Sequence, residues 1–119
     1  KMAICSASPQ NGLENFVKNN NFDEFISVIV SAYDYPHEEH KPSPIPYQNT
    51  LKALEVNASQ TIAIEDSPSG VQSALNAGIY TVAMRSYADN VIEKVNAIGP
   101  TLQVSDFPEL LQHLVDETL

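Results

Sequence analysis

Short apolar runs rich in β-branched residues alternate along the chain with stretches of helical periodicity. This alternation predicts a parallel β-sheet, because parallel strands need long crossover connections that are usually helical. Most of the runs are apolar on both faces, as is typical of strands covered by helices on both sides. The expected strands are residues 2–6, 26–31, 61–65, 80–84 and 101–104. We therefore assign the chain to the α/β class.

Several linkers carry apolar residues one helical turn apart, which predicts helices with one buried face. The expected stripes are Leu13, Phe16 and Val17 in the first linker, and Tyr47, Leu51 and Leu54 in the second. Two further helices are expected over residues 89–97 and 108–118. The buried face of the last helix is expected to consist of Leu110, Leu111 and Leu114.

The helix after residues 61–65 has the clearest limits. Ser67 is placed to cap its N-terminus, Pro68 suits its first turn, and Gly78 ends it. Its buried stripe is expected to consist of Val71, Ala74 and Leu75.

Composition and charge narrow the range of partners. The 119 residues, 43% of them hydrophobic, suffice for one domain over residues 1–119. Six Lys and Arg against fifteen Asp and Glu give a net charge of −9, which repels nucleic acid and anionic membranes. The apolar run at residues 2–5 is far shorter than the roughly 20 residues of a membrane span. The single Cys5 cannot form an internal disulfide, which fits a cytoplasmic location.

The first candidate site follows the strand at residues 2–6, because ligands of open parallel sheets bind at the carboxyl ends of strands. The turn Ser6-Ala7-Ser8 offers hydroxyl and backbone N–H groups that can hold a phosphoryl oxygen. The alternative is that Ser8, Asn11 or a neighbouring residue caps the next helix. The two interpretations are compatible with each other.

The second candidate is Lys41, which precedes the rigid run Pro42-Ser43-Pro44. A lysine held in place can neutralise a phosphate. The alternative is a solvated lysine beside Glu38 and Glu39. The residues alone leave both interpretations open.

The third candidate is Glu65-Asp66-Ser67, which closes one strand and opens the capped helix. Two adjacent carboxylates at a sheet edge can hold Mg²⁺, which prefers oxygen ligands. The alternative is that Asp66 only complements the positive N-terminus of the helix. Two carboxylates cannot complete an octahedral shell, so water, substrate or other residues must supply further ligands.

Taken in order, three motifs resemble the second, third and fourth motifs of the haloacid dehalogenase superfamily. They are Ser6 after a strand, Lys41 in KPSPIPY, and Glu65-Asp66 with Gly70 in IEDSPSG. The chain is most similar to the subgroup of β-phosphoglucomutase and phosphoglycolate-phosphatase-like enzymes. The resemblance spans nearly the whole chain and implies a Rossmann-like, three-layer core with a mostly parallel sheet.

The resemblance also implies a role for each motif. Ser6 and the backbone N–H of Ala7 would bind the phosphoryl group of a small phosphorylated metabolite. Lys41 would pair with the same group and with an Asp nucleophile. Glu65 and Asp66 would hold Mg²⁺ directly or through water.

The family's first motif, DxDx[TV], is missing, and no DxD occurs in the sequence. This motif carries the nucleophile that forms an aspartyl-phosphate, and the helical cap domain that follows it is missing too. Since an apolar run also follows Lys1 at once, we expect a fragment with an incomplete core. The missing strand would lie between the strands matching residues 2–6 and 61–65. Open strand edges favour pairing, so a strand-swapped or edge-paired dimer is a further expectation.

The sequence thus favours a Mg²⁺-dependent phosphatase-type hydrolase whose isolated 119-residue chain is inactive and binds Mg²⁺ weakly or not at all. Pro9-Gln10 stands where mutase-like members have a Lys-Asn pair, which favours a phosphatase over a sugar-phosphate mutase. A β-phosphoglucomutase-like mutase remains one alternative. A non-catalytic α/β binding or interaction module is the other.

Overall fold

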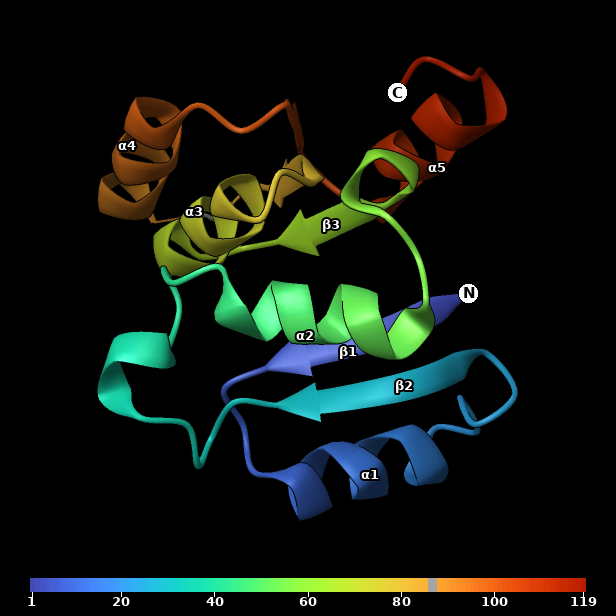
Figure 1. Cartoon of the computed structure of the whole chain (residues 1–119). Coiled ribbons are helices and arrows are strands. Elements are labelled where there is room, and N and C mark those ends of the chain that lie inside the picture. Colours follow the sequence, from blue (N-terminus) through green and yellow to red (C-terminus); the bar gives the residue numbers. More distant parts are fainter. Residues whose placement is uncertain (86–87) are drawn as a thin grey trace.

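The computed structural model describes residues 1–85 and 88–119, and this part of the chain contains five strands and five α-helices (Figure 1). The strands are β1 (Met2–Ser6), β2 (Ile26–Ser31), β3 (Ile62–Glu65), β4 (Tyr80–Met84) and β5 (Leu102–Val104). The helices are α1 (Gln10–Asn19), α2 (Ile45–Leu54), α3 (Pro68–Asn76), α4 (Asp89–Ile98) and α5 (Phe107–Val115). Every strand predicted from the sequence is present, with residues 61 and 101 left outside β3 and β5.

The strands form two parallel sheets. β1 pairs with β2, in a register that runs from Met2 opposite Ile26 to Ser6 opposite Ser31. The second sheet has the order β3-β4-β5. Over residues 1–85 and 88–119 no ladder joins β1 to β3, so both strands have an open edge. The α/β class is confirmed, and the sheet divides where the resemblance placed a missing strand.

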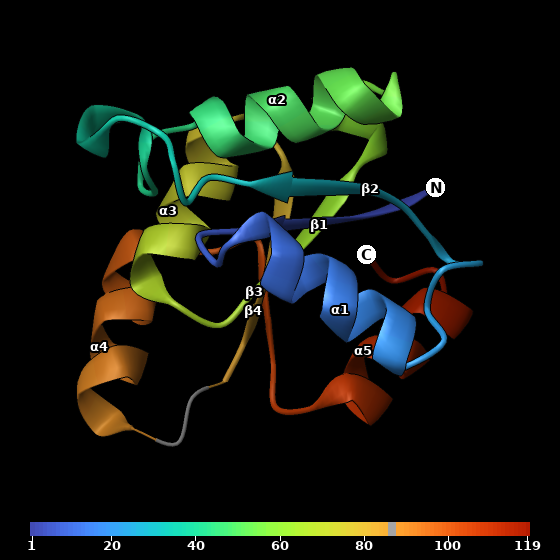
Figure 2. The same cartoon turned by 90° about the horizontal axis from the view of Figure 1, so that it is seen from below.

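Helices cover both faces of the strands. β1 and β2 lie between α1 and α2 (Figure 2). On β4, Val82 packs with Leu110 of α5, whereas Ala83 packs with Val71 of α3 and Val95 of α4. Neighbouring residues of a strand point to opposite faces, so α5 lies across the sheet from α3 and α4. The result is the expected three-layer, Rossmann-like core, in partial form.

α3 begins and ends where the sequence predicts. The Ser67 hydroxyl accepts a hydrogen bond from the N–H of Gly70 at 3.1 Å, and Pro68 is the first helical residue. Gly78 ends the helix with φ of +76°, a conformation that glycine adopts at little cost. Val71 and Ala74 are fully buried, so the stripe that anchors α3 is confirmed at these positions.

Two predicted buried faces are wrong in part. Phe16 of α1 is 52% exposed, and Leu111 and Leu114 of α5 are 60% and 48% exposed. Ile62 and Ile64, on one face of β3, are exposed as well. Each of these helices packs on part of one sheet, α1 on β2 and α5 on β4 and β5, so the side chains beyond that contact stay exposed.

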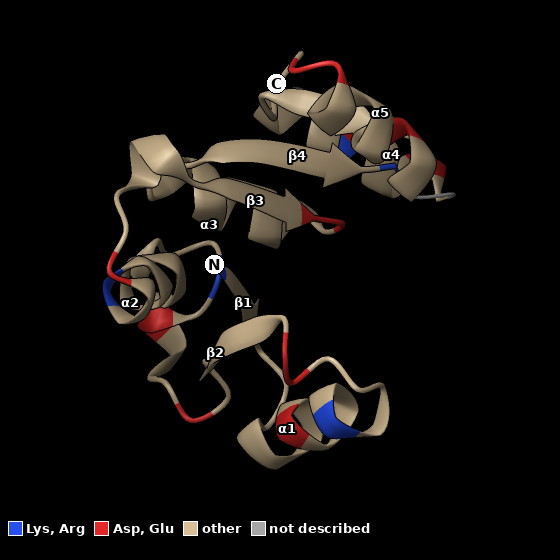
Figure 3. Ribbon diagram, turned by 90° about the vertical axis from the view of Figure 1, so that its right-hand side faces the viewer, with Lys and Arg blue, Asp and Glu red and all other residues tan. Residues whose placement is uncertain are grey.

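Two further features of the fold are the distribution of its acidic residues and the length of its helices. Acidic residues occur in loops and helices around the molecule, including the carboxyl end of β3 (Figure 3). Among the described helices none is both long and apolar enough to cross a membrane.

Candidate functional site

The residues expected to bind phosphate and metal, which are Ser6, Ala7, Lys41, Glu65 and Asp66, line one pocket of about 390 Å³. Ser6 and Ala7 reach it from the end of β1, Lys41 from the loop before α2, and Glu65 and Asp66 from the end of β3. The pocket lies at the carboxyl ends of two strands from different sheets. This is the position at which open α/β sheets bind ligands.

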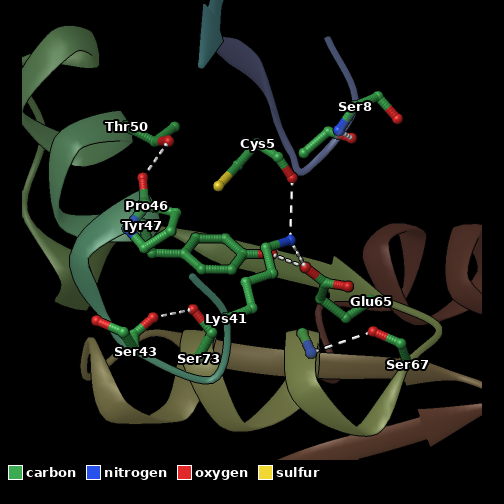
Figure 4. A network of polar contacts seen from close by, with 12 residues as sticks. Cys5, Ser8, Lys41, Ser43, Pro46, Tyr47, Thr50, Glu65, Ser67 and Ser73 are labelled. Atoms are coloured by element: carbon green, nitrogen blue, oxygen red, sulfur yellow. Dashed lines mark hydrogen bonds and ion pairs between the residues drawn. The ribbon is translucent and has the colours of Figure 1, made fainter. Parts of the chain in front are cut away.

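Lys41 is held inside the molecule rather than solvated. Its side chain is 14% exposed, and its ammonium group donates to the carbonyl oxygen of Cys5 at 3.0 Å and forms an ion pair with Glu65 (Figure 4). The interpretation as a solvated lysine beside Glu38 and Glu39 is therefore wrong. The reason is that Lys41 finds a buried carboxylate partner on β3, which is distant in the sequence.

The loop that carries Lys41 is tied to α3. The Ser73 hydroxyl donates to the carbonyl oxygen of Ser43 at 2.6 Å, and the side-chain amide of Asn76 donates to that of Pro42 at 3.1 Å. Ser73 is fully buried. These bonds hold the loop at a fixed place beside the pocket, in addition to the stiffness of its prolines.

Tyr47 belongs to the site, although the sequence assigned it only to a buried stripe. Its hydroxyl donates to Oε1 of Glu65 at 2.5 Å, and the Lys41 ammonium lies 4.9 Å from the centre of its ring (Figure 4). Burial, together with the nearby Glu65 carboxylate, raises the pKa of the Tyr47 phenol well above its ordinary value. A tyrosine on a buried helix face needs a hydrogen-bond partner, and this was the available signal.

The turn after β1 has its own hydrogen bonds. The Ser6 hydroxyl accepts a hydrogen bond from the N–H of Ser8 at 3.1 Å, and the Ser31 hydroxyl donates to the Ser8 carbonyl at 2.6 Å. Pro9 occupies the N-cap position of α1, which has no side-chain cap. Ser8 therefore does not cap this helix, whereas the side chain of Asn11, in the first turn, accepts a hydrogen bond from the N–H of Gly12 at 2.9 Å. The turn is fixed at the pocket by Ser6 and β2 instead.

Glu65 and Asp66 present carboxylate oxygens of the kind that Mg²⁺ prefers. One oxygen of Glu65 is engaged by Lys41 and Tyr47, whereas Asp66 is exposed at the pocket. Over the described ranges, no three His, Cys, Asp or Glu side chains converge as a metal site. The donor type fits a hard cation, and the ligand number requires oxygens from elsewhere.

A second hollow, of about 370 Å³, runs between β1 and β3. Its walls come from both strands and from α2, and they include Ala3, Tyr47, Leu54 and Ala63. Cys5 lines both this groove and the pocket, as does Ile64. Burial raises the pKa of the Cys5 thiol above its ordinary value. The groove between the open sheet edges therefore leads directly to the candidate site.

Comparison with known proteins adds a family and several relatives. The model of the haloacid dehalogenase-like hydrolases matches residues 1–84. Pyrophosphatase PpaX of Bacillus mycoides is 28% identical, over 86% of this chain and 52% of its own length. The structure of a putative β-phosphoglucomutase from Thermotoga maritima superposes with a TM-score of 0.80 at 26% identity, over 100% of this chain and 53% of that one.

A further solved structure is CbbY of Rhodobacter sphaeroides in complex with xylulose-(1,5)bisphosphate. It has a TM-score of 0.76 at 25% identity, over 92% of this chain and 48% of its own. The chain thus spans about half the length of the relatives it matches.

Proposed function

Because the chain belongs to the haloacid dehalogenase-like hydrolases, we propose that it forms the phosphate- and metal-binding part of a phosphatase-type hydrolase. The substrate is a small phosphorylated metabolite, and the nucleophilic Asp that forms the aspartyl-phosphate lies outside these residues. The observation that carries the proposal is the convergence of Lys41, Glu65 and Asp66 with the Ser6-Ala7 turn on one pocket. The pyrophosphatase and bisphosphate-binding relatives support a phosphorylated substrate.

The proposed roles follow from what phosphoryl transfer needs, which is positioning and neutralisation of oxygen charge. The Lys41 ammonium would offset the charge of the phosphoryl group. The Ser6 hydroxyl and the N–H of Ala7 would donate hydrogen bonds to its oxygens. The fixed loop and turn supply both functions without reorganisation during the reaction.

Asp66 and Glu65 would hold Mg²⁺ at this site. When bound, Mg²⁺ supplies additional positive charge beside the phosphoryl oxygens. Asp66 is the better direct ligand because it is exposed at the pocket, whereas Glu65 has only its second oxygen available. The remaining ligands would come from water, from the substrate and from the polypeptide outside these residues.

The groove between β1 and β3 gives that outside polypeptide a place to bind. A strand there would satisfy the open edges of both strands and bury apolar side chains from Ala3 to Ile64. If it runs parallel to its neighbours, its carboxyl end emerges at the pocket beside Glu65. A nucleophilic Asp on that strand would thus reach the phosphoryl group, as family membership implies. The relatives, which are about twice as long as this chain, support a segment of the same protein as the occupant.

The reactivity of Cys5, which lines the groove, can show whether a strand binds there. Its thiol should react slowly with iodoacetamide in the 119-residue chain, because burial raises its pKa and the thiolate is the reactive form. Adding in trans the segment of the complete protein that we propose as this strand should slow the reaction at least several-fold further, with the unfolded chain as the reference rate. An unchanged rate would contradict the strand proposal. A concentration-dependent dimer that shields Cys5 equally would identify a second copy as the occupant.

Asp66→Asn in the complete protein tests the proposed activity. It removes a ligand charge with little change in volume, so Mg²⁺-dependent release of phosphate from a phosphomonoester should fall by roughly a hundredfold or more. Asp23→Asn is the matched control, since Asp23 is exposed in the turn before β2. Wild-type turnover in Asp66→Asn at limiting Mg²⁺ would contradict the metal assignment. Faster interconversion of hexose phosphates than phosphate release would identify a mutase instead.

A further inference from the structure

The carboxylate of Glu65 lies in a closely fitted seat. Its Oε1 is contacted by the Tyr47 hydroxyl and by the Lys41 ammonium (Figure 4). On its other side the carboxylate lies against Gly70 of α3, and it occupies the space that a side chain on Gly70 would need. A Cβ on Gly70 would overlap both carboxylate oxygens of Glu65.

Gly70 therefore has a packing reason to be glycine. It is buried inside a helix and its φ is not positive, so the backbone conformation does not require glycine. Gly70 lies in the first turn of α3, where glycine still favours the helix less than alanine does, by up to about 1 kcal/mol. This cost is offset because the absence of a Cβ on Gly70 leaves room for the Glu65 carboxylate.

Tyr47 contributes to the seat in two ways. Its hydroxyl fixes one oxygen of Glu65, and its ring lies beneath the Lys41 ammonium. The charged groups of Lys41 and Glu65 are thus both oriented by one side chain that is itself buried on α2. Without the hydroxyl, Oε1 of Glu65 would keep only the flexible Lys41 side chain as partner.

We infer that Tyr47 and Gly70 are positioning residues that seat the Glu65 carboxylate at the mouth of the pocket. They leave its second oxygen for a metal ion and keep Lys41 beside it. The inference rests on the proposed metal-binding role of Glu65. Residues that orient a metal ligand typically contribute 10- to 100-fold to metal affinity or activity.

Gly70→Ala tests whether Gly70 sets the position of the Glu65 carboxylate. The Glu65 side chain is flexible and can move away, so the variant should still fold. Its midpoint of thermal unfolding should lie below that of the wild type, because the contacts of Glu65 with Lys41 and Tyr47 are weakened, and the higher helix propensity of alanine offsets this loss only in part. Gly12→Ala is the matched control, because Gly12 also lies within a helix but has open space where its Cβ would be. Tyr35→Phe is the matching control for Tyr47→Phe, since the Tyr35 hydroxyl accepts a hydrogen bond from the Asn49 amide, outside the candidate site.

The first measurement is the ¹³C resonance of the Glu65 carboxyl carbon in the metal-free 119-residue chain. Gly70→Ala and Tyr47→Phe should both shift it towards the values of exposed glutamates, and Gly12→Ala and Tyr35→Phe should leave it in place. This measurement does not depend on any activity. An unmoved resonance in both site variants would overturn the inference that Tyr47 and Gly70 position the Glu65 carboxylate.

The second measurement is the Mg²⁺ concentration needed for half-maximal phosphatase activity of the complete protein. It should rise roughly 10- to 100-fold in Gly70→Ala and Tyr47→Phe, with little change in the KM of the phosphomonoester. An unchanged Mg²⁺ requirement despite a shifted resonance would overturn the positioning role. Absence of any Mg²⁺-dependent activity in the wild-type protein would overturn the proposed function. The resonance would still show whether Tyr47 and Gly70 position the Glu65 carboxylate.

Discussion

At the scale of single residues, the site is organised around one buried carboxylate. Glu65 accepts hydrogen bonds from Lys41 and Tyr47, and this pairing makes it possible to bury its charge. A charged group that loses its partners in such a place is strongly destabilising. The sequence predicted Lys41 and Glu65 as site residues, but the bond between them joins two segments that only the fold brings together.

Because of Tyr47, the free energy of unfolding of the chain should decrease at alkaline pH. Its folded pKa is raised, chiefly by burial, above the unfolded value of about 10. The unfolded chain therefore loses this proton first, and the stabilisation, complete below pH 10, is lost as the pH rises. Between pH 9 and pH 11, the free energy of unfolding should fall about 1.4 kcal/mol more in wild type than in Tyr47→Phe.

Urea unfolding in metal-free buffer at several pH values measures this difference. Tyr35→Phe serves as the control and should follow the wild type. Parallel pH profiles for wild type and Tyr47→Phe would show that the Tyr47 phenol ionises as easily in the folded chain as in the unfolded one.

At the scale of secondary-structure elements, local signals in the sequence were sufficient for α3 and insufficient for α1 and α5. Ser67, Pro68 and Gly78 act on their own helix, so their effect can be inferred without knowledge of the fold. The burial of Phe16 or Leu111 depends on whether a sheet lies beneath the helix. No periodicity in the helix contains that information.

The Ser67 cap should have a measurable effect on stability. Ser67→Ala removes the acceptor for the Gly70 N–H and should lower the free energy of unfolding by about 1 kcal/mol. Ser59→Ala, at an exposed position, should change it by less than about 0.5 kcal/mol. Equal unfolding midpoints for the two variants in urea would contradict the capping role.

At the scale of the whole molecule, the main feature is the division of the sheet between β1 and β3. The order of the sequence motifs predicted where the division falls, because each motif follows a strand of known place in the family's sheet. The groove itself and its continuity with the pocket through Cys5 and Ile64 could not be predicted, since they depend on side-chain packing across both sheets. The fold thus places the proposed binding residues on both sides of the gap between β1 and β3, where we propose that one more strand binds.

We propose that these 119 residues bind and orient a phosphoryl group but lack the nucleophile that attacks it. The most direct test is hydrolysis of a generic phosphomonoester by the purified chain at saturating Mg²⁺, before and after the upstream segment is added in trans. We predict no turnover by the chain alone, because the two carboxylates at the pocket, Glu65 and Asp66, are assigned to Mg²⁺ and no third carboxylate of the described residues lines it as a nucleophile. With the upstream segment, phosphate release should begin and should depend on Asp66. Robust turnover by the chain alone, abolished by Asp66→Asn, would contradict this account.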